Sequence, residues 1–483
     1  MTITHDIVQK LWKLCTLLRN DGVTYHQYVT ELTYILFLKM MEETGNEGQL
    51  PEGYRWGDLA KLKGLEQMEA YRHLLIHLGT HGSSRVQAIF ANAGTIIKQP
   101  KTLTDLVTEI DKLDWYSARQ EGLGDLYEGL LEKNAGETKS GAGQYFTPRP
   151  LIDVIVKLMK PEAGEVIQDP AAGTGGFLIA ADRHIKETTD DFFDLSTEQA
   201  EFQRNQAITG MELVQDTHRL CLMNLMLHSL EGGVVYGDTL SSAGEHLPKA
   251  NLVLSNPPFG SSSGGGLPSR NDFLHPTANK QLAFLQHIYR GLKRDGRAAV
   301  VLPDNVLFED NTGKLVRQEL MNKCSLHTIL RLPTGIFYAQ GVKTNVLFFT
   351  RGQEDENNTD AVWVYDLRTN APKFGKRTPL TEAHFDDFLE AYGEDPHGRS
   401  QRQDQGEAGK WRCFTREEIA KRGDNLDITW LKDESASSAE DLPEPDVIAA
   451  QIMNNLRLAL GEMEALSEIL ESTADQESTE TAE

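Results

Sequence analysis

The sequence predicts a doubly wound, mostly parallel α/β domain that follows an all-α domain and precedes a helical tail. Between residues 150 and 350, short apolar runs alternate with amphipathic helical stretches, which is typical of right-handed β-α-β crossovers. Before residue 135, apolar residues recur at helical spacing instead. After residue 430, an acidic linker precedes one more apolar stripe. We therefore expect three parts, at 1–135, 136–430 and 431–483.

The first part contains two runs of apolar residues at helical spacing. One run starts at Ile7 and Leu11 and continues to Leu18, and the other passes through Leu32, Leu36 and Met40. Such faces either pack into the core of a small helical domain or hold a partner protein. Core packing is the simpler interpretation.

Seven apolar runs are the candidate strands of the α/β domain. They lie at 165–169, 207–212, 233–238, 251–256, 297–303, 326–333 and 345–350, and helices fit between them at 177–187, 214–228 and 280–292. A further strand candidate covers 361–367. The basic patch KFGKR that follows, at 373–377, is either a phosphate contact or a solvated turn.

Composition and charge narrow the classes of function. The 483 residues carry a net charge of −24, which by itself disfavours nucleic acid as a partner. Residues 431–483 contain 14 acidic and 2 basic side chains, so half of that charge lies in the tail. No signal peptide or membrane span is expected, which favours a cytoplasmic protein. The four cysteines have no close spacing, so we predict neither a disulfide framework nor a metal site.

The stretch DPAAGTGGF, 169–177, lies where the first strand of the α/β domain passes into its first helix. Its glycines permit a tight turn and the close approach of a ligand to the backbone, and a helix N-terminus offers free N–H groups. The spacing fits neither G-x-G-x-x-G nor the P-loop. A glycine turn alone is weak support for a binding site, although the carboxyl end of a strand is where such sites lie.

Carboxylates follow at the ends of the next two predicted strands, Glu212 and Asp238. An acidic residue at the second strand can accept hydrogen bonds from both hydroxyls of a ribose, and one at the third can reach an exocyclic amino group. Each taken singly is more simply a surface or capping carboxylate. Three such groups along successive strand ends indicate a binding site rather than a coincidence.

The fourth strand ends in NPPF, 256–259. Both prolines lack an N–H and hold φ near −65°, so the chain leaves the sheet as a stiff loop. Asn256 Oδ1 and the carbonyl of Pro257 could accept from one amino group, while Phe259 offers a face for a planar base. Such acceptors would aim the lone pair of an aromatic amine at an electrophile without a strong base.

Together with GQYFTPRP at 143–150, these motifs resemble the gamma-order amino-methyltransferases, and more narrowly the modification subunits of type I restriction-modification systems. The resemblance covers nearly the whole chain. It implies a seven-stranded methyltransferase fold that uses S-adenosylmethionine and methylates N6 of a flipped-out adenine in double-stranded DNA.

The resemblance also assigns roles to matching residues. Asn256, Pro257 and Phe259 would hold the target adenine. The positions implied for the cofactor are Tyr145, Phe146, Thr147, Asp169, Gly173, Thr174, Gly175, Gly176, Phe177, Glu212 and Asp238. Among them, Asp169 would bind the cofactor's amino group, Glu212 the ribose and Asp238 the adenine.

The family resemblance implies partners, because no recognition domain follows the catalytic core. Two modification chains would hold DNA around one specificity subunit, and a nuclease and translocase subunit would join for cleavage. The apolar stripe at 446–471 is our candidate contact with the specificity subunit, and docking on this chain is the alternative. Residues 260–270 suit either a flap over the flipped base or a plain connector.

Two other classes of function stay open. The first is a methyltransferase of another substrate class, because related loops occur in enzymes that methylate protein glutamine or guanine in ribosomal RNA. The second is a non-catalytic assembly scaffold. A C5-cytosine methyltransferase is disfavoured because the sequence contains no Pro-Cys nucleophile.

Overall fold

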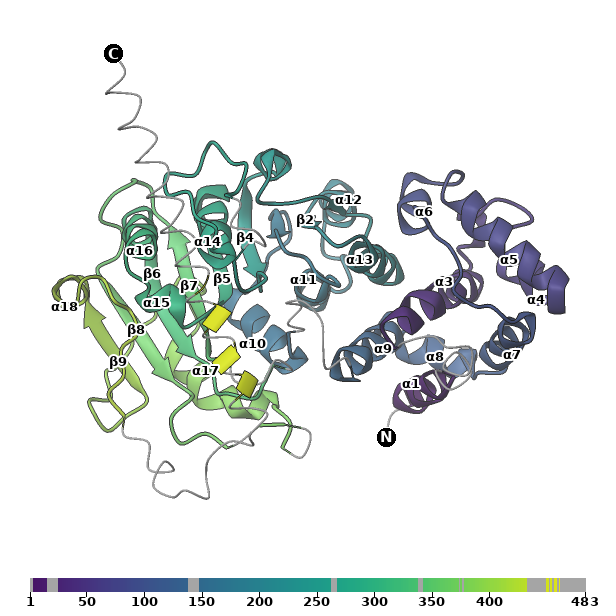
Figure 1. The fold of residues 1–483 in the computed structure, drawn as a ribbon. Coiled ribbons are helices and arrows are strands. Elements are labelled where there is room, and N and C mark those ends of the chain that lie inside the picture. The colour runs from purple at the N-terminus through teal and green to yellow at the C-terminus, as the bar shows by residue number, and fades with distance from the viewer. Residues whose placement is uncertain are drawn as a thin grey trace, which may run out of the picture. The chain divides into compact units, whose positions relative to one another are not determined.

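The computed structural model of the chain describes residues 3–14, 25–137, 147–261, 267–337, 342–372, 374–375 and 378–431, and part of 449–460. These residues form two compact units (Figure 1). The first unit contains Met1–Gly141, Gly173–Gly175 and Leu213–Tyr236, and the second contains the rest of the chain.

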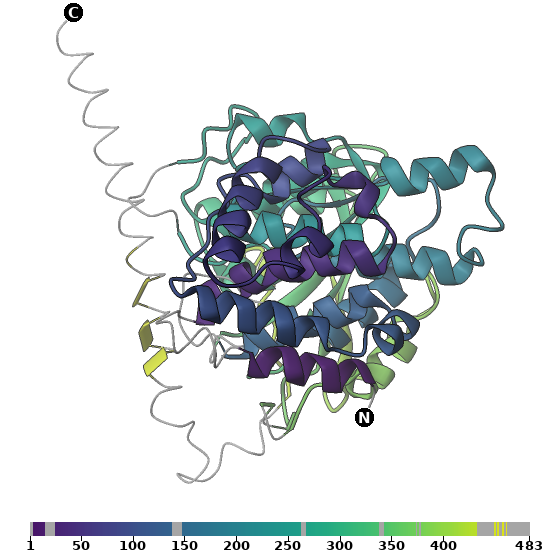
Figure 2. The same ribbon diagram turned by 90° about the vertical axis from the view of Figure 1, so that its right-hand side faces the viewer.

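The N-terminal helices of the first unit run side by side (purple to blue in Figure 2). Its elements are α1 (Ile3–Lys13), α3 (Tyr25–Glu43), α4 (Trp56–Ala60), α5 (Gly64–Leu78), α6 (Ser84–Ile89), α7 (Pro100–Asp111), α8 (Trp115–Glu121), α9 (Leu123–Glu137), α13 (Gln215–Leu227) and strand β3 (Gly233–Tyr236). Helix starts follow the local sequence. Ser83 caps α6 by accepting from Val86 N, and Pro100 occupies the first turn of α7, where its missing N–H costs nothing.

The predicted apolar faces form the core of this unit. Leu11 on α1 and Leu32, Leu36 and Met40 on α3 are each fully buried in one hydrophobic cluster. This confirms the interpretation of those faces as core packing. The first predicted run continues past residue 14, outside the described residues.

Two arginines explain why α13 and β3 belong to the helical unit although they follow the first two strands of the sheet. Arg219 on α13 donates to the carbonyls of Ile89 (2.6 Å) and Ala91 (2.8 Å), at the end of α6. Arg85 on α6 donates to the carbonyl of Gly232 (3.0 Å), just before β3. Each guanidinium uses its several donors to satisfy backbone carbonyls that have no partner in a helix or sheet.

The second unit holds the other strands and the helices that cover them. The strands are β1 (Ile167–Asp169), β2 (Ile208–Glu212), β4 (Ala250–Ser255), β5 (Leu292–Pro303), β6 (Cys324–Arg331), β7 (Thr344–Arg351), β8 (Ala361–Asp366) and β9 (Trp411–Thr415). The helices are α10 (Arg149–Met159), α11 (Gly176–Thr188), α12 (Thr197–Asn205), α14 (Lys280–Gly291), α15 (Asn305–Phe308), α16 (Thr312–Lys323), α17 (Asp386–Tyr392) and α18 (Arg416–Lys421).

The sheet has the strand order β3-β2-β1-β4-β5-β7-β6-β8-β9. Strand β1 pairs in parallel with β2 and β4, and β4 pairs in parallel with β5. Strand β7 runs antiparallel to both β5 and β6. The doubly wound, mostly parallel arrangement is therefore confirmed, the further strand candidate at 361–367 forms β8, and β9 extends the sheet beyond the predicted strands.

Helices cover both faces of this sheet. Leu285 on α14 and Leu320 on α16 pack with Ala298 and Val300 of β5 in one buried cluster. Arg297 leaves β5 on the opposite face, since successive side chains alternate, and donates to the carbonyl at the end of α10 (2.7 Å). This layering leaves the ends of the strands accessible, and the ends carry the site.

Several strand limits differ from the prediction. Strand β5 begins at Leu292, five residues early, because Lys293, Arg294 and Asp295 are exposed and hide its start from an apolar pattern. Strand β3 ends at Tyr236, so Asp238 lies two residues beyond it. The sequence analysis did not predict β9, an edge strand antiparallel to β8.

The tail is described only in part. Residues 449, 450, 452, 453, 456, 457 and 460 are helical, and the rest of the predicted helix at 446–471 lies outside the described residues. Among the described helices, none is long and apolar enough to cross a membrane.

Candidate active site

Parallel pairing brings the ends of β1, β2 and β4 to one edge of the sheet (Figure 1). Asp169 is the last residue of β1, and Glu212 is the last residue of β2. Ser255 ends β4, and Asn256 follows it directly. This carboxyl edge is where ligand sites lie in open α/β sheets.

Asp169 is buried, with 2% of its surface exposed. Its Oδ1 accepts from Ser255 Oγ at 2.7 Å and from Ala171 N at 3.0 Å. The pKa of the Asp169 carboxyl is raised to about 7, mainly by burial; the two hydrogen bonds oppose the rise, and the negative charge of Glu212 adds to it. A cationic ligand group beside Asp169 would favour the ionised carboxylate, which could then accept hydrogen bonds from that group.

Glu212 at the end of β2 and Asp238 in the loop after β3 lie in segments that contact each other. Glu212 is 9% exposed, and its carbonyl accepts from Gly237 N at 3.0 Å, which starts the loop that carries Asp238. Asp238 Oδ1 accepts from Leu240 N at 2.9 Å, so the carboxylate is held by its own turn. Thr239 Oγ1 donates to the carbonyl of Pro170 at 2.6 Å, which joins this turn to the one after β1.

The glycine stretch after Asp169 forms the link from β1 to α11. Gly173 and Gly175 have φ of 55° and 84°, in the left-handed region that favours glycine. A Cβ on Gly176, the first residue of α11, would lie 3.1 Å from Ile152 Cδ1, so this glycine permits close packing of α10 on α11. Thr174 accepts from Asn224 through its carbonyl (3.0 Å), and Phe177 is a buried core side chain.

The NPPF loop is held at both ends. Asn256 Nδ2 donates to Thr147 Oγ1 at 2.9 Å, which connects the FTP motif before α10 to the residue after β4. Because Asn256 Nδ2 points toward Thr147, Oδ1 of the same amide points away from Thr147. The carbonyl of Gly260 accepts from Lys280 N (3.1 Å) at the start of α14. Pro257 is buried and Phe259 is half-buried.

Comparison with known proteins assigns this arrangement to a family. The model of the family described as N-6 DNA Methylase matches residues 118–440, and that of the HsdM N-terminal domain matches residues 7–110.

The chain belongs to the N-6 DNA methylase family.

Relatives within the family share most of their length with this chain. It is 55% identical, over 96% of its length and 94% of the relative's, to the type I restriction enzyme StySJI methylase subunit of Salmonella typhimurium. The crystal structure of the EcoKI M protein matches with 50% identity and a TM-score of 0.58, covering 96% of each chain. A structure described under complex assembly and conformational transition of the type I R-M system matches with 27% identity and a TM-score of 0.72, covering 98% of this chain and 99% of that one.

Two of the residues that the motifs predict for this N-6 DNA methylase lie outside the described residues, namely Tyr145 and Phe146. Among the other predicted residues, Asn256 donates a hydrogen bond to Thr147. Glu212 lies near enough to Asp169 to shift its pKa.

Sequence reasoning missed three residues at this edge of the N-6 DNA methylase. Ser255 binds Asp169, and Thr239 binds the turn after β1. Arg270 is 7% exposed, pairs with Asp272 (2.7 Å) and donates to the carbonyl of Thr239 at 2.8 Å. These contacts of Arg270 hold the C-terminal end of the 260–270 segment in place. A buried small polar residue between an apolar strand and NPPF was a usable signal for Ser255, but nothing local marks Arg270.

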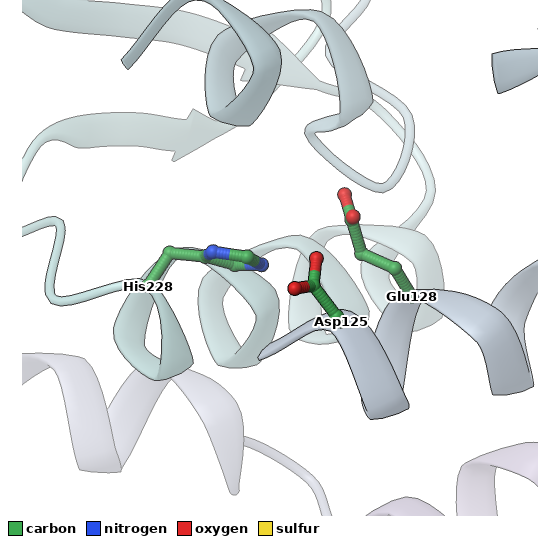
Figure 3. Close-up of side chains that lie close together, drawn as sticks. All are labelled: Asp125, Glu128 and His228. Atoms are coloured by element: carbon green, nitrogen blue, oxygen red, sulfur yellow. The ribbon is translucent and has the colours of Figure 1, made fainter. Parts of the chain in front are cut away.

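A separate group of possible metal ligands lies in the helical unit (Figure 3). Asp125 and Glu128 on α9 and His228 at the end of α13 each offer one ligand atom, and these atoms lie within 4.8 Å of one another. Carboxylate and imidazole groups of this kind can bind a divalent cation. The sequence analysis predicted no metal site and placed His228 only at the end of a helix.

Proposed function

We propose that this chain transfers the methyl group of S-adenosylmethionine to N6 of an adenine in double-stranded DNA, as the modification subunit of a type I restriction-modification complex. The observation that carries the proposal is the pair of hydrogen bonds at the end of β4. Ser255 binds Asp169, and the next residue, Asn256, binds Thr147. The end of β4 would thus hold both Asp169, which would bind a cofactor group, and Asn256, which would bind the target amine.

The residues at the carboxyl edge fit S-adenosylmethionine. The buried Asp169 carboxylate would accept from the cofactor's ammonium group, which would compensate the cost of ionising a buried acid. Glu212 would accept from the ribose hydroxyls and Asp238 from the adenine amino group. The residues from Gly173 to Phe177 would let the backbone approach the ligand, and Tyr145, Phe146 and Thr147 would flank its methionine part.

The NPPF loop would hold the target base. Bound S-adenosylmethionine supplies an electrophilic methyl group. Asn256 Oδ1 and the carbonyl of Pro257 would accept the two hydrogens of the adenine N6, which directs the nitrogen lone pair outward. Phe259 would stack on the base, which must first leave the duplex. The reaction then depends on position and on fixed dipoles rather than on a strong base.

We further propose that sequence recognition belongs to a separate specificity subunit, with two modification chains per specificity subunit and a nuclease and translocase subunit for cleavage. The names of the relatives as subunits of type I enzymes support this. The exposed side chains of Ile452, Leu456 and Leu460 on the tail helix, at 54–60% exposure, support a contact with another protein there.

A division into a helical domain at 1–135, a catalytic domain at 136–430 and a tail at 431–483 accords with this assembly. We infer a cytoplasmic location from the need to meet chromosomal DNA.

Methylation of DNA by the reconstituted complex tests the proposal. The full chain, mixed with its cognate specificity subunit and methyl-labelled cofactor, should place label on N6 of adenine in duplex DNA. Label found only in protein glutamine or in ribosomal RNA guanine would overturn the assignment, and no transfer at all would favour an assembly scaffold.

The Asn256→Ala variant is the matching test of the site. It should lose at least about a hundredfold in methyl transfer, because one preorganised acceptor contributes roughly that much to a transition state. Cofactor affinity measured by calorimetry should change little. A variant that methylates at the wild-type rate would remove Asn256 from the mechanism.

A further inference from the structure

A basic cavity of about 460 Å³ opens on the second unit, away from the site described above. Six cationic side chains line it, together with Leu292 and the carboxylate of Asp355. The cations are Lys249, Arg290, Lys293, Arg294, Lys323 and Arg351. In a chain with a net charge of −24, this concentration of positive charge requires an explanation.

The cavity lies at the opposite edge of the sheet from Asn256. Lys249 directly precedes β4, whereas Asn256 directly follows it, and Lys323 precedes β6 in the same way. A strand of six residues spans about 20 Å. A ligand in the cavity would therefore not contact the proposed cofactor or base.

Carboxylates near the cavity do not balance its charge. Asp355 is shared by Arg294 (2.9 Å), Lys323 (3.9 Å) and Arg351. Glu319 serves both Arg290 and Lys323, at 3.5 and 3.8 Å.

Asp272, the third carboxylate within ion-pair distance, is 3.9 Å from Arg290 and also binds Arg270. The six cationic side chains, taken as a group, thus have three carboxylates within ion-pair distance. Each of these carboxylates pairs with at least two cationic side chains. Like charges held this close repel one another unless an anion joins them.

Among the residues that the structure describes, no carboxylate lies within ion-pair distance of the two exposed lysines. Lys293 Nζ donates to the neutral amide oxygen Asn251 Oδ1 at 2.8 Å, and both Lys249 and Lys293 are exposed at the rim. Guanidinium groups bind phosphate oxygens in pairs, and ammonium groups add point charges. The lining therefore has the chemistry of a phosphate site.

We propose that this cavity binds a compact anion that carries several phosphate groups, and that it recognises the phosphates rather than a base. A cavity of this volume suits a small ligand. None of the described residues that line the cavity is aromatic, so the lining offers no ring on which a base could stack. Nucleoside triphosphates and inorganic oligophosphates share this chemistry, and the experiment separates them.

Calorimetry on the full chain tests the site with tripolyphosphate, ATP, GTP and AMP as probes. Tripolyphosphate, ATP and GTP should bind with similar dissociation constants, well below about 1 mM, and AMP at least about tenfold more weakly. Raising the salt concentration should weaken all of them. A clear preference for one nucleoside over tripolyphosphate would overturn recognition by phosphate alone.

Charge reversal at the rim locates the binding. Lys249→Glu with Lys293→Glu should weaken tripolyphosphate binding at least about tenfold, while Lys249→Arg with Lys293→Arg should stay within about threefold of wild type. Lys61→Glu with Lys112→Glu makes the same charge change on two exposed lysines of the helical unit and should have little effect. Methyl transfer should stay at the wild-type rate in the rim variant.

Three further results would overturn the proposal. They are the absence of saturable binding by any phosphate probe, an equal loss of affinity in the Lys61 and Lys112 control, and displacement of tripolyphosphate by duplex DNA at equal phosphate concentration. The last result would make the cavity part of a nucleic-acid surface.

Discussion

At the scale of single residues, one hydrogen bond connects the two halves of the proposed site. Ser255 Oγ donates to the buried carboxylate of Asp169, and the adjacent Asn256 is oriented by Thr147. Burial sets the protonation of Asp169 near neutrality, and the Ser255 bond favours the ionised form. Cofactor binding and base positioning therefore share a short rigid segment at the end of β4.

Cofactor affinity should depend on pH through Asp169. Its pKa of about 7 in the free chain means that the carboxyl is largely protonated at pH 6. A bound ammonium group favours the ionised form, so binding releases a proton, and affinity should rise about fivefold to tenfold from pH 6 to 7.5. Calorimetry in buffers of different ionisation enthalpy would measure both the affinity and the proton released.

Two variants control this experiment. Ser255→Ala removes a hydrogen bond that lowers the pKa of Asp169, so the rise in affinity should move to higher pH. Asp169→Asn removes the titrating group, and it should bind weakly with a flat profile. An unchanged profile in Asp169→Asn would show that another group titrates.

Thr147 is expected to be a positioning residue that acts through Asn256. Thr147→Val keeps the shape but removes the acceptor for Asn256 Nδ2, so methyl transfer should fall about tenfold to a hundredfold with little change in the cofactor's dissociation constant. Thr147→Ser keeps the hydroxyl and should restore most of the rate. If valine and serine variants behave alike in single-turnover assays, the hydroxyl does not orient Asn256.

At the scale of elements, close packing between helices depends on a glycine that the sequence does not distinguish. A Cβ on Gly124 in α9 would lie 2.5 Å from Nε2 and 2.8 Å from Cδ2 of His228, at the end of α13. This close approach lets the imidazole lie beside Asp125 and Glu128 (Figure 3). A backbone position without a side chain thus sets the separation of two helices within the helical unit.

Gly124→Ala should destabilise the helical unit by about 1–3 kcal/mol, because overpacking outweighs the higher helix propensity of alanine. Urea unfolding measures the change. Gly57→Ala in α4 is the matched control, since nothing lies within 4 Å of its Cβ, and it should be neutral or slightly stabilising.

A second substitution tests the cause of the loss. Adding His228→Ala to Gly124→Ala should relieve the overlap and make the two changes strongly non-additive. Simple additivity of the two changes would show that the overlap is not the cause.

At the scale of the whole molecule, we expect the acidic, partly apolar tail to bind a partner protein. Half of the net charge lies in residues 431–483, and the described part of the tail helix exposes Ile452, Met453, Leu456 and Leu460. An amphipathic helix gains little stability until its apolar face is covered. The specificity subunit is the partner that we propose for it.

Substitutions on the tail helix should separate assembly from catalysis. Ile452→Glu with Leu456→Glu, like deletion of all residues after 446, should prevent co-purification with the specificity subunit. Arg457→Glu makes the same change in net charge on the same helix and should keep the complex. Assembly of the double variant at wild-type levels would assign the helix another role.

The loops of the proposed site could be predicted because their chemistry is local in sequence. NPPF stiffens its own backbone, and the glycines at 173 and 175 mark a left-handed turn wherever the chain places them. The alternation of apolar runs likewise predicted the α/β class, because burial against helices on both faces selects such runs. Strand β9 and the polar start of β5 carried no such pattern.

The sequence by itself therefore determined the fold class, the order of the strands along the chain and the loops that carry Asp169, Glu212 and Asn256. Only the tertiary structure decided that Ser255 meets Asp169, that Thr147 meets Asn256, and that six cations line one cavity. The physical reason is distance along the chain. Ser255 and Asp169 are 86 residues apart and Asn256 and Thr147 are 109 apart, so their contacts follow from sheet order and helix packing rather than from any local pattern.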